Sequence, residues 1–361
     1  MKHPLSLAIL AAAACSLAAT SRAAPVGERH LTTTDATAAL RDAEHRPDVR
    51  VTVWYPAAQG AVEQRIDLGR DPGHPVFRVG AVSPYAAFAD NRPRPVILFS
   101  HGFGGTARMM GWFGTALARA GYVVVAVDHP GNNGADKMTV PGAIMSWERA
   151  QDLHAALDAV KADADIGPHL DATRVGVSGF SAGGFTSLVS VGAKVDMNRF
   201  QAFCRDHPTD GVCAPQKEFT VTAEDVAHAL ATPEIAAEFA HAGDDHAIPG
   251  VRAAFAIAPA IVQALPPEGL AQIKPPVAII IGAADPVAPP DTNGLVAAKA
   301  IPHAELKVLP GVGHYDFLST CTPAGVAAVP LCAAIKVPQD PTHQAAIDMA
   351  LAFFGRTLGE P

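Results

Sequence analysis

Short apolar runs rich in valine and isoleucine alternate with longer segments of helical periodicity, from about residue 95 to the end of the chain. Apolar runs of about four to eight residues bounded by turn residues are typical of strands. The predicted strands are 49–55, 95–100, 122–128, 174–178, 251–258, 277–281 and 305–309. Helices are predicted at 109–120, 146–164, 182–193 and 341–358. The alternation predicts an α/β fold, with a mostly parallel central sheet and helices on both faces.

One stretch, 194–250, interrupts this alternation. It separates the predicted helix 182–193 from the next core strand by far more residues than connections usually contain. Short helical patterns lie within it, at 221–230 and 233–242. We expect a helical insertion that forms either a lid or substrate wall, or a surface subdomain without contact to the chemistry.

Composition narrows the class of protein. The chain has 361 residues, of which 49% are apolar and 17% are charged, so it can bury a sizeable core in one or two domains. Disordered and collagen-like chains are excluded by this balance. The 27 Lys and Arg residues are scattered and the net charge is −8, so nucleic acid is not an expected partner.

The N-terminal residues 1–23 have the pattern of a secretory signal peptide. Lys2 precedes an apolar stretch over 5–19, and Ser-Arg-Ala at 21–23 is a small-residue cleavage site. Lipidation at Cys15 is disfavoured because Ala12 stands where a leucine is usual. We therefore expect a soluble mature domain over 24–361 that is secreted or periplasmic and contains no membrane span.

Export changes the interpretation of the cysteines, because disulfides persist in oxidising compartments. The local pairing of Cys204 with Cys213 and of Cys321 with Cys332 is favoured, since each closes a short loop with little apolar content. A zinc site is disfavoured because no Cys-x-x-Cys pair is present. The His and Asp residues at 241–246 are interpreted as a solvated loop rather than a metal site. No metal is expected.

The most informative motif is Gly-Phe-Ser-Ala-Gly at 179–183, which follows a predicted strand and begins a predicted helix. In that context the serine lies on a sharp turn, and the flanking glycines remove side chains that would block its hydroxyl. Ser181 is therefore the predicted nucleophile. Phe180, beside it, is a candidate for contact with a substrate, although it can equally pack in the core.

A serine hydroxyl needs a base, and the base needs an acid that orients it. In strand–turn–helix arrangements of this kind the acid and the histidine follow the serine in that order, each after a later strand. Asp285 follows the strand 277–281 and His314 follows the strand 305–309. We predict a triad of Ser181, His314 and Asp285, with Asp316 as a local support.

Attack by the serine places negative charge on a substrate oxygen, which N–H donors must stabilise. The predicted donors are the backbone N–H groups of Ala182 and Phe103, the second from a glycine-rich loop after the strand 95–100. His101 is expected to support that loop rather than to act as the base. Trp112 and Trp147 are candidates for the approach to the substrate.

With these motifs in place, the chain resembles the α/β-hydrolase superfamily. More closely, it is similar to the predicted dienelactone hydrolases and the secreted type II platelet-activating-factor acetylhydrolases, and more loosely to bacterial cutinase-like polyesterases. The segments that carry the resemblance are Val51-Thr-Val-Trp-Tyr-Pro-Ala57, Ser100-His-Gly102, Val127-Asp-His-Pro-Gly131 and Gly179-Phe-Ser-Ala-Gly-Gly184. The resemblance implies ester cleavage, including short acyl esters of phospholipids.

Two departures from these families limit how far their properties can be assigned to this chain. The acetylhydrolase branch has its triad acid just after the strand that follows the nucleophile helix, where this chain has Pro259 and Ala260. Dienelactone hydrolases use a cysteine nucleophile, whereas this chain has Ser181.

The function predicted from the sequence is a serine esterase that forms an acyl-enzyme intermediate and requires no cofactor. A small-molecule or lipid-like ester is the expected substrate. Three alternatives remain at this stage: a lipolytic or polyester-cleaving enzyme, a peptidase or amidase, and a non-catalytic binding protein on the same fold.

Overall fold

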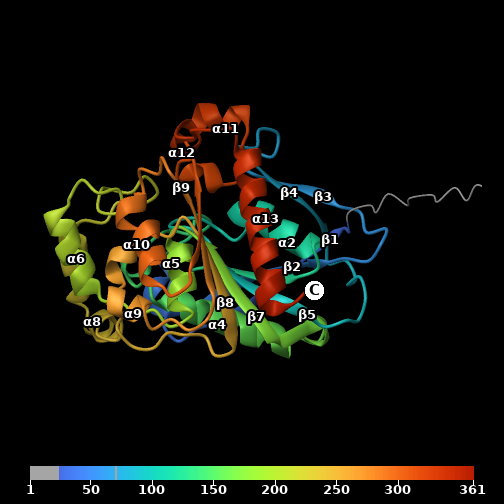
Figure 1. Ribbon diagram of the computed structural model, residues 1–361, viewed down its shortest axis with the longest axis horizontal. Coiled ribbons are helices and arrows are strands. Elements are labelled where there is room, and N and C mark those ends of the chain that lie inside the picture. Colours follow the sequence, from blue (N-terminus) through green and yellow to red (C-terminus); the bar gives the residue numbers. More distant parts are fainter. Residues whose placement is uncertain (1–23, 70) are drawn as a thin grey trace, which may run out of the picture.

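The strands form one mixed sheet in the computed structural model, which describes residues 24–69 and 71–361 (Figure 1). The predicted signal peptide, 1–23, lies outside the described residues. The order across the sheet is β10-β9-β8-β7-β5-β6-β2-β1-β4-β11, and β3 pairs with β4. The strands are β1 (Val26–Thr34), β2 (Asp48–Pro56), β3 (Gln64–Leu68), β4 (Phe77–Pro84), β5 (Arg94–Ser100), β6 (Val123–Asp128), β7 (Leu170–Phe180), β8 (Val251–Ile257), β9 (Val277–Gly282), β10 (Glu305–Leu309) and β11 (Thr320–Cys321).

The parallel half of the sheet agrees with the sequence prediction. β10, β9, β8, β7, β5 and β6 run parallel to one another. β2 and β1 then continue the sheet in antiparallel pairing. The strands β1, β3 and β4 were not predicted, because they carry polar residues that alternate or cluster at the surface, as in the Thr32–Thr34 end of β1.

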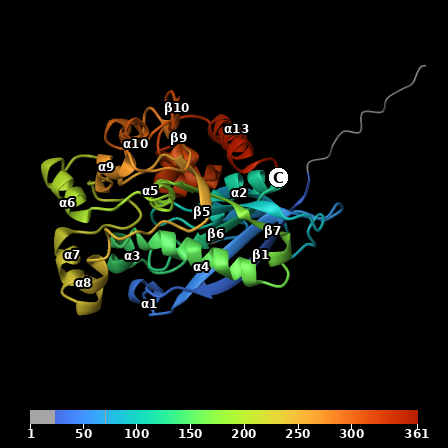
Figure 2. The same cartoon turned by 60° about the horizontal axis from the view of Figure 1, so that its bottom comes forward.

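Helices cover both faces of the sheet, and the strand alternation assigns side chains to each face. Val96 and Leu98 of β5 belong to one apolar cluster, whereas Ile97 and Phe99 belong to the other. Helices α4, α5 and α10 pack in the first layer, and α2 and α13 pack in the second (Figure 2). The helices are α1 (Ala38–Arg41), α2 (Gly111–Arg119), α3 (Val140–Ile144), α4 (Glu148–Ala162), α5 (Ala182–Val189), α6 (Met197–Asp206), α7 (Ala223–Leu230), α8 (Pro233–Phe239), α9 (Pro267–Leu270), α10 (Gly294–Ala300), α11 (Pro323–Ala328), α12 (Pro330–Ala333) and α13 (Gln339–Leu358).

Helix α5 is shorter than predicted. It ends at Val189 rather than at residue 193, and Gly192 adopts φ 105° just after it. That left-handed conformation turns the chain away from the helix axis, because glycine has no Cβ to oppose it. The insertion therefore starts a few residues earlier than the periodicity suggests.

The insertion between α5 and β8 contains α6, α7 and α8, which form the end of the molecule farthest from the C-terminus (Figures 1 and 2). A disulfide joins Cys204 to Cys213 within it, and a second joins Cys321 to Cys332. This is the local pairing favoured from the sequence. Each bridge closes a short loop and so lowers the conformational entropy of the unfolded chain. A bridge of this kind typically raises the free energy of unfolding by about 2–4 kcal/mol.

Candidate active site

Ser181 lies on a sharp turn between β7 and α5. Its φ of 58° and ψ of −117° are unusual for a residue with a side chain, and such strain is often found at functional sites. The turn requires small neighbours: a Cβ on Gly179 would lie 2.2 Å from the carbonyl oxygen of Gly183, and one on Gly183 would lie 1.9 Å from that of Ser100. The two glycines thus allow the close backbone approach that presents the serine hydroxyl.

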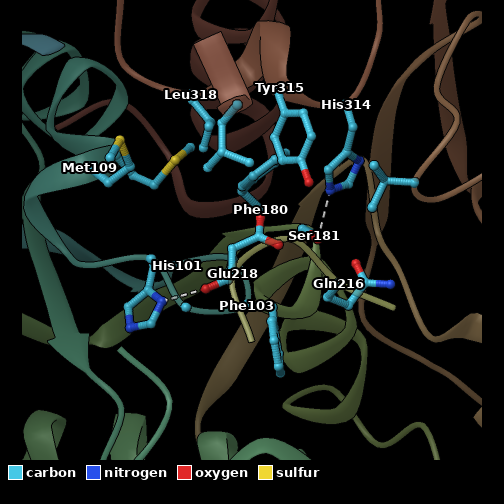
Figure 3. Close-up of a pocket in the computed structure, with 16 residues that line it drawn as sticks. His101, Phe103, Met109, Phe180, Ser181, Gln216, Glu218, His314, Tyr315 and Leu318 are labelled. Atoms are coloured by element: carbon cyan, nitrogen blue, oxygen red, sulfur yellow. Dashed lines mark hydrogen bonds between the residues drawn. The ribbon is translucent and has the colours of Figure 1, made fainter. Parts of the chain in front are cut away.

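Ser181, His314 and Asp285 are linked by two hydrogen bonds. Nε2 of His314 lies 2.8 Å from Oγ of Ser181 (Figure 3). Nδ1 of His314 lies 2.6 Å from Oδ2 of Asp285. All three side chains are buried. An ionised carboxylate can only accept, so Nδ1 donates to Asp285 and Nε2 accepts the hydroxyl proton of Ser181. The arrangement places a base in contact with the serine hydroxyl.

The acid and the histidine come from loops after neighbouring parallel strands, β9 and β10, as the sequence predicts. Oδ1 of Asp285 accepts the backbone N–H groups of Val287 and Ala288, each at 2.8 Å, so the carboxylate is held by its own loop. Asp316 accepts the N–H groups of Gly313 and Lys336 and thereby braces the loop that carries His314.

The two predicted oxyanion donors, Phe103 and Ala182, line the larger cavity together with Ser181. Ala182 is the first residue of α5, so its N–H has no intrahelical partner. Phe103 lies in the loop after β5, and it lines a cavity together with Ser181 and Ala182. Within residues 24–69 and 71–361, neither N–H makes a hydrogen bond. Both are therefore free to donate to a bound oxygen.

A buried histidine and arginine support the glycine-rich loop. His101 bonds the carbonyl oxygen of Gly102 through Nδ1 and accepts the N–H of His129 through Nε2. Burial lowers the pKa of His101 well below its usual value, so the ring is neutral and can make both bonds. The guanidinium of Arg149 donates to the carbonyl oxygen of His101 and to Oγ of Ser100. His101 thus acts in this structure as a loop support.

Behind this loop lies a buried ion pair between Arg41 and Asp152. The guanidinium donates to both carboxylate oxygens, each at 2.8 Å, and Nδ1 of His129 lies 2.8 Å from the same carboxylate. His129 in turn bonds Oγ of Ser100 at 2.9 Å. The network therefore connects α1 and α4 to the end of β5, directly beneath the loop that contains Phe103.

Two cavities meet at Ser181. The larger, of about 270 Å³, is mainly apolar and is lined largely by the insertion. Its lining includes Met197, Phe200, Val221, Val226 and Phe239. The smaller, of about 60 Å³, has His314 in its lining. Residues of the insertion therefore line the larger cavity together with Ser181.

Phe180 lines the smaller cavity, and its ring centroid lies 4.8 Å from that of His314.

The expectation for the two tryptophans was wrong, since neither lines either cavity at Ser181. Trp112 donates its indole N–H to the carbonyl oxygen of Phe317 and stacks on His343. Trp147 is fully buried and packs against Phe239. The large apolar area of the two indole rings favours their burial in the core over contact with a substrate.

Sequence reasoning missed Gln216, Glu218 and Tyr315, which line the smaller cavity. Gln216 and Glu218 lie in an irregular part of the insertion whose position no periodicity indicates. Tyr315 directly follows His314, and this adjacency was the only feature of the sequence that indicated a place near the site.

A pH dependence of stability follows from His343. Burial lowers the pKa of His343 to about 4, whereas the unfolded chain has its ordinary value near 6.5. Between these values the unfolded chain binds a proton that the folded protein does not, so the free energy of unfolding falls as pH falls. We expect His343 to account for a loss of about 2–3 kcal/mol between pH 7 and pH 4.5 in urea titrations.

The control is a matched pair of variants. His343→Gln should show a shallower pH dependence than the wild type, and the exposed His228→Gln should keep the full slope. An identical slope in the wild type and His343→Gln contradicts this assignment. Burial lowers the pKa values of His101 and His129 in the same direction, so some slope remains in every variant.

No group of three or more His, Cys, Asp or Glu side chains in 24–69 and 71–361 is arranged to hold a metal ion. At the predicted solvated loop, His241 and Asp244 are exposed and bond to each other at 2.8 Å. Among the helices of the described chain, none combines the length and the apolar character that a membrane span requires.

Comparison with known proteins agrees with this architecture. A sequence model of the Alpha/beta hydrolase family matches residues 97–329, so the chain belongs to this family. A solved structure of a ferulic acid esterase from Streptomyces cinnamoneus superimposes with a TM-score of 0.59 at 22% identity, covering 94% of this chain and 92% of that one. At this identity the likeness shows the fold alone.

Two curated relatives are similar over a shorter region. Cutinase est1 and cutinase est2 of Thermobifida alba are each 32% identical to this chain over 110 residues. That region is 30% of this chain and 34% and 33% of the two cutinases. The chain thus matches about a third of the length of these relatives.

Proposed function

We propose that this protein is a secreted serine hydrolase that cleaves carboxylic esters. The observation that carries the proposal is the hydrogen-bonded sequence from Asp285 through His314 to Ser181, which ends at two cavities. Family membership and the partial similarity to cutinases favour ester substrates. The two disulfides and the leader-like 1–23 segment support export to an oxidising compartment.

In the proposed reaction, Oγ of Ser181 attacks the ester carbonyl carbon while Nε2 of His314 takes the hydroxyl proton. The N–H groups of Phe103 and Ala182 stabilise the resulting oxyanion. Collapse of the tetrahedral intermediate breaks the bond to the alcohol oxygen, which receives the proton from His314. Water then repeats the sequence on the acyl-enzyme and releases the acid. Asp285 keeps His314 in the required tautomer and stabilises its charged form.

The larger cavity is suited to the acyl group. Its lining is mainly apolar, and its volume of about 270 Å³ lies near the lower end of the range of about 300–1000 Å³ for small-molecule sites. Burial of each additional methylene contributes about 0.8 kcal/mol until the cavity is filled. We therefore propose short to medium acyl chains as the preferred substrates, rather than the long chains of lipids.

The test is hydrolysis of p-nitrophenyl esters from acetyl to palmitoyl by the mature protein. We expect kcat/KM to rise with chain length from acetyl, reach a maximum at a short or medium chain, and fall for palmitoyl. A maximum at palmitoyl favours a lipolytic enzyme instead. Hydrolysis of a matched anilide at a rate equal to that of the ester favours an amidase. Absence of hydrolysis of every ester by the folded protein refutes the proposal.

A pair of tryptophan substitutions on α7 tests where the acyl group binds. Both alanines are exposed, but Ala223 lines the larger cavity, whereas Ala227, one turn further along, does not. Ala223→Trp should lower kcat/KM for the octanoyl ester, relative to kcat/KM for the acetyl ester, by roughly tenfold. The reason is that the indole occupies part of the cavity that a long acyl chain needs. Ala227→Trp should keep the wild-type ratio. Equal ratios in both variants place the acyl group elsewhere.

A further inference from the structure

One carboxylate oxygen of Glu218, in the smaller cavity beside Ser181, is buried and has no hydrogen-bond partner in the described chain. The residue is part of the insertion and lines the smaller cavity, together with Ser181 and His314. Within residues 24–69 and 71–361, its Oε2 atom is inaccessible to solvent and makes no hydrogen bond, and no Lys or Arg nitrogen lies within 4.0 Å of the carboxylate. A buried acceptor without a partner is costly, so its retention calls for a ligand or a specific role.

The groups around Glu218 are polar on one side and apolar on the other. The Tyr315 hydroxyl and the Gln216 amide line the same cavity, and Figure 3 shows the Glu218 carboxylate and the Tyr315 hydroxyl both directed toward its Ser181 end. Burial raises the pKa of Tyr315, and so does the neighbouring Glu218 carboxylate, through its negative charge and as an acceptor for the Tyr315 hydroxyl, which therefore stays protonated. The Lys217 ammonium lies 5.5 Å from the Tyr315 ring centroid. Phe180 and Leu318 supply apolar contacts.

The position of His314 decides which half of an ester occupies this cavity. His314 must return its proton to the leaving alcohol oxygen, so the alcohol lies on the side of the serine that His314 lines. His314 lines the smaller cavity and not the larger one, whereas Ala182 lines the larger. The acyl group therefore points into the apolar cavity, and the alcohol points toward Glu218.

We infer that Glu218, with Tyr315 and Gln216, binds a hydroxyl group on the alcohol half of the substrate. This inference rests on the proposed ester hydrolysis. It assigns esters of diols, polyols or sugars as preferred substrates over esters of simple alcohols. A hydroxyl donates to the free Glu218 oxygen and accepts from Tyr315 or Gln216, which line the same cavity.

A pair of esters with the same number of heavy atoms isolates the hydroxyl. In 2-hydroxyethyl butanoate, a hydroxyl replaces the terminal methyl group of propyl butanoate. We expect the wild type to prefer the hydroxyethyl ester by at least roughly tenfold in kcat/KM, because a site that hydrogen-bonds a substrate hydroxyl rejects the analogue that lacks it. Glu218→Met, which keeps the length of the side chain, should bring the ratio of the two rates close to one.

The matched control is Glu224→Met, which removes an exposed carboxylate from the same insertion and should keep the wild-type ratio. Thermal unfolding followed by circular dichroism checks that each variant folds, and the ratio of rates is independent of the amount of folded protein. A wild-type ratio near one overturns the inference. So does a Glu218→Met variant that keeps the wild-type ratio.

A second pair of esters distinguishes a hydroxyl site from a cation site. Choline butanoate and 3,3-dimethylbutyl butanoate have similar shapes, but only the first is charged. We expect less than a threefold preference for choline butanoate, and a strong preference that Glu218→Met abolishes overturns the hydroxyl assignment. Failure of the folded wild type to hydrolyse any of the four esters refutes the proposed function itself, whereas equal hydrolysis of all four refutes only the inference about Glu218.

Discussion

Replacement of Ser181 by alanine should lower kcat/KM for p-nitrophenyl butanoate by about four orders of magnitude or more. The variant keeps the cavities and the oxyanion donors but loses the atom that attacks the ester, so only the weak activity of a positioned water remains. Ser181 is 6% exposed, and its Oγ bonds only His314 within the described chain. The substitution should therefore change the folding free energy little.

The matched control for this experiment is Ser190→Ala. Ser190 lies just after α5, is buried like Ser181, and bonds the carbonyl oxygen of Thr186 at 2.8 Å, away from both cavities. It should keep wild-type kcat/KM within about threefold. Rates measured at equal protein concentration, with folding of each variant checked by circular dichroism, decide the matter. A Ser181→Ala variant that retains more than about a tenth of the activity is incompatible with a serine nucleophile.

Replacement of Asp152 by alanine should lower the free energy of unfolding by about 3–5 kcal/mol. Arg41 is 1% exposed, and its guanidinium loses both hydrogen bonds to the carboxylate when Asp152 is removed. A buried charge without its partner costs more than the pair contributes, because the charge remains desolvated. Asp35, at 2.9 Å, compensates only in part. Urea unfolding at pH 7 measures the effect.

The control is Asp158→Ala on the same helix, α4. Asp158 is 59% exposed and pairs with Lys161 at the surface, so its loss should change the free energy of unfolding by less than about 0.5 kcal/mol. Asp152→Ala should also lower activity at a temperature where it is still folded, because His129 and Ser100 lose their anchor beneath the oxyanion loop. A loss of stability below about 1 kcal/mol shows that Arg41 finds another partner.

The parallel strands and the Ser181 turn were predictable because their signals are local. Strands such as β9, with Val277–Gly282 fully buried, are apolar at every position and are bounded by turn residues. The glycines around Ser181 mark places where the backbone approaches other segments too closely for a side chain. Asp285 and His314 were found by chain order, since each must follow a strand of the same parallel sheet.

The antiparallel strands and the substrate contacts had no such signal. In β1, only the first three residues are buried, and the polar remainder pairs with β2 through its backbone. Trp112 and Trp147 were candidates for contact with the substrate, but both are buried in the core. Glu218 has no motif around it, and its place beside Tyr315 depends on how the insertion folds back.

The sequence by itself determined the fold class, the order of the triad along the chain and the pairing of cysteines that are near in sequence. Each depends on spacing, on close backbone approaches that only glycine permits, or on short loops, and these are local properties. Only the tertiary structure decided that the insertion lines the larger cavity, that Arg41 meets Asp152 across 111 positions, and that Glu218 and His314 line the same smaller cavity. Those relations depend on packing between distant segments, where burial and the pairing of charges select one arrangement among many.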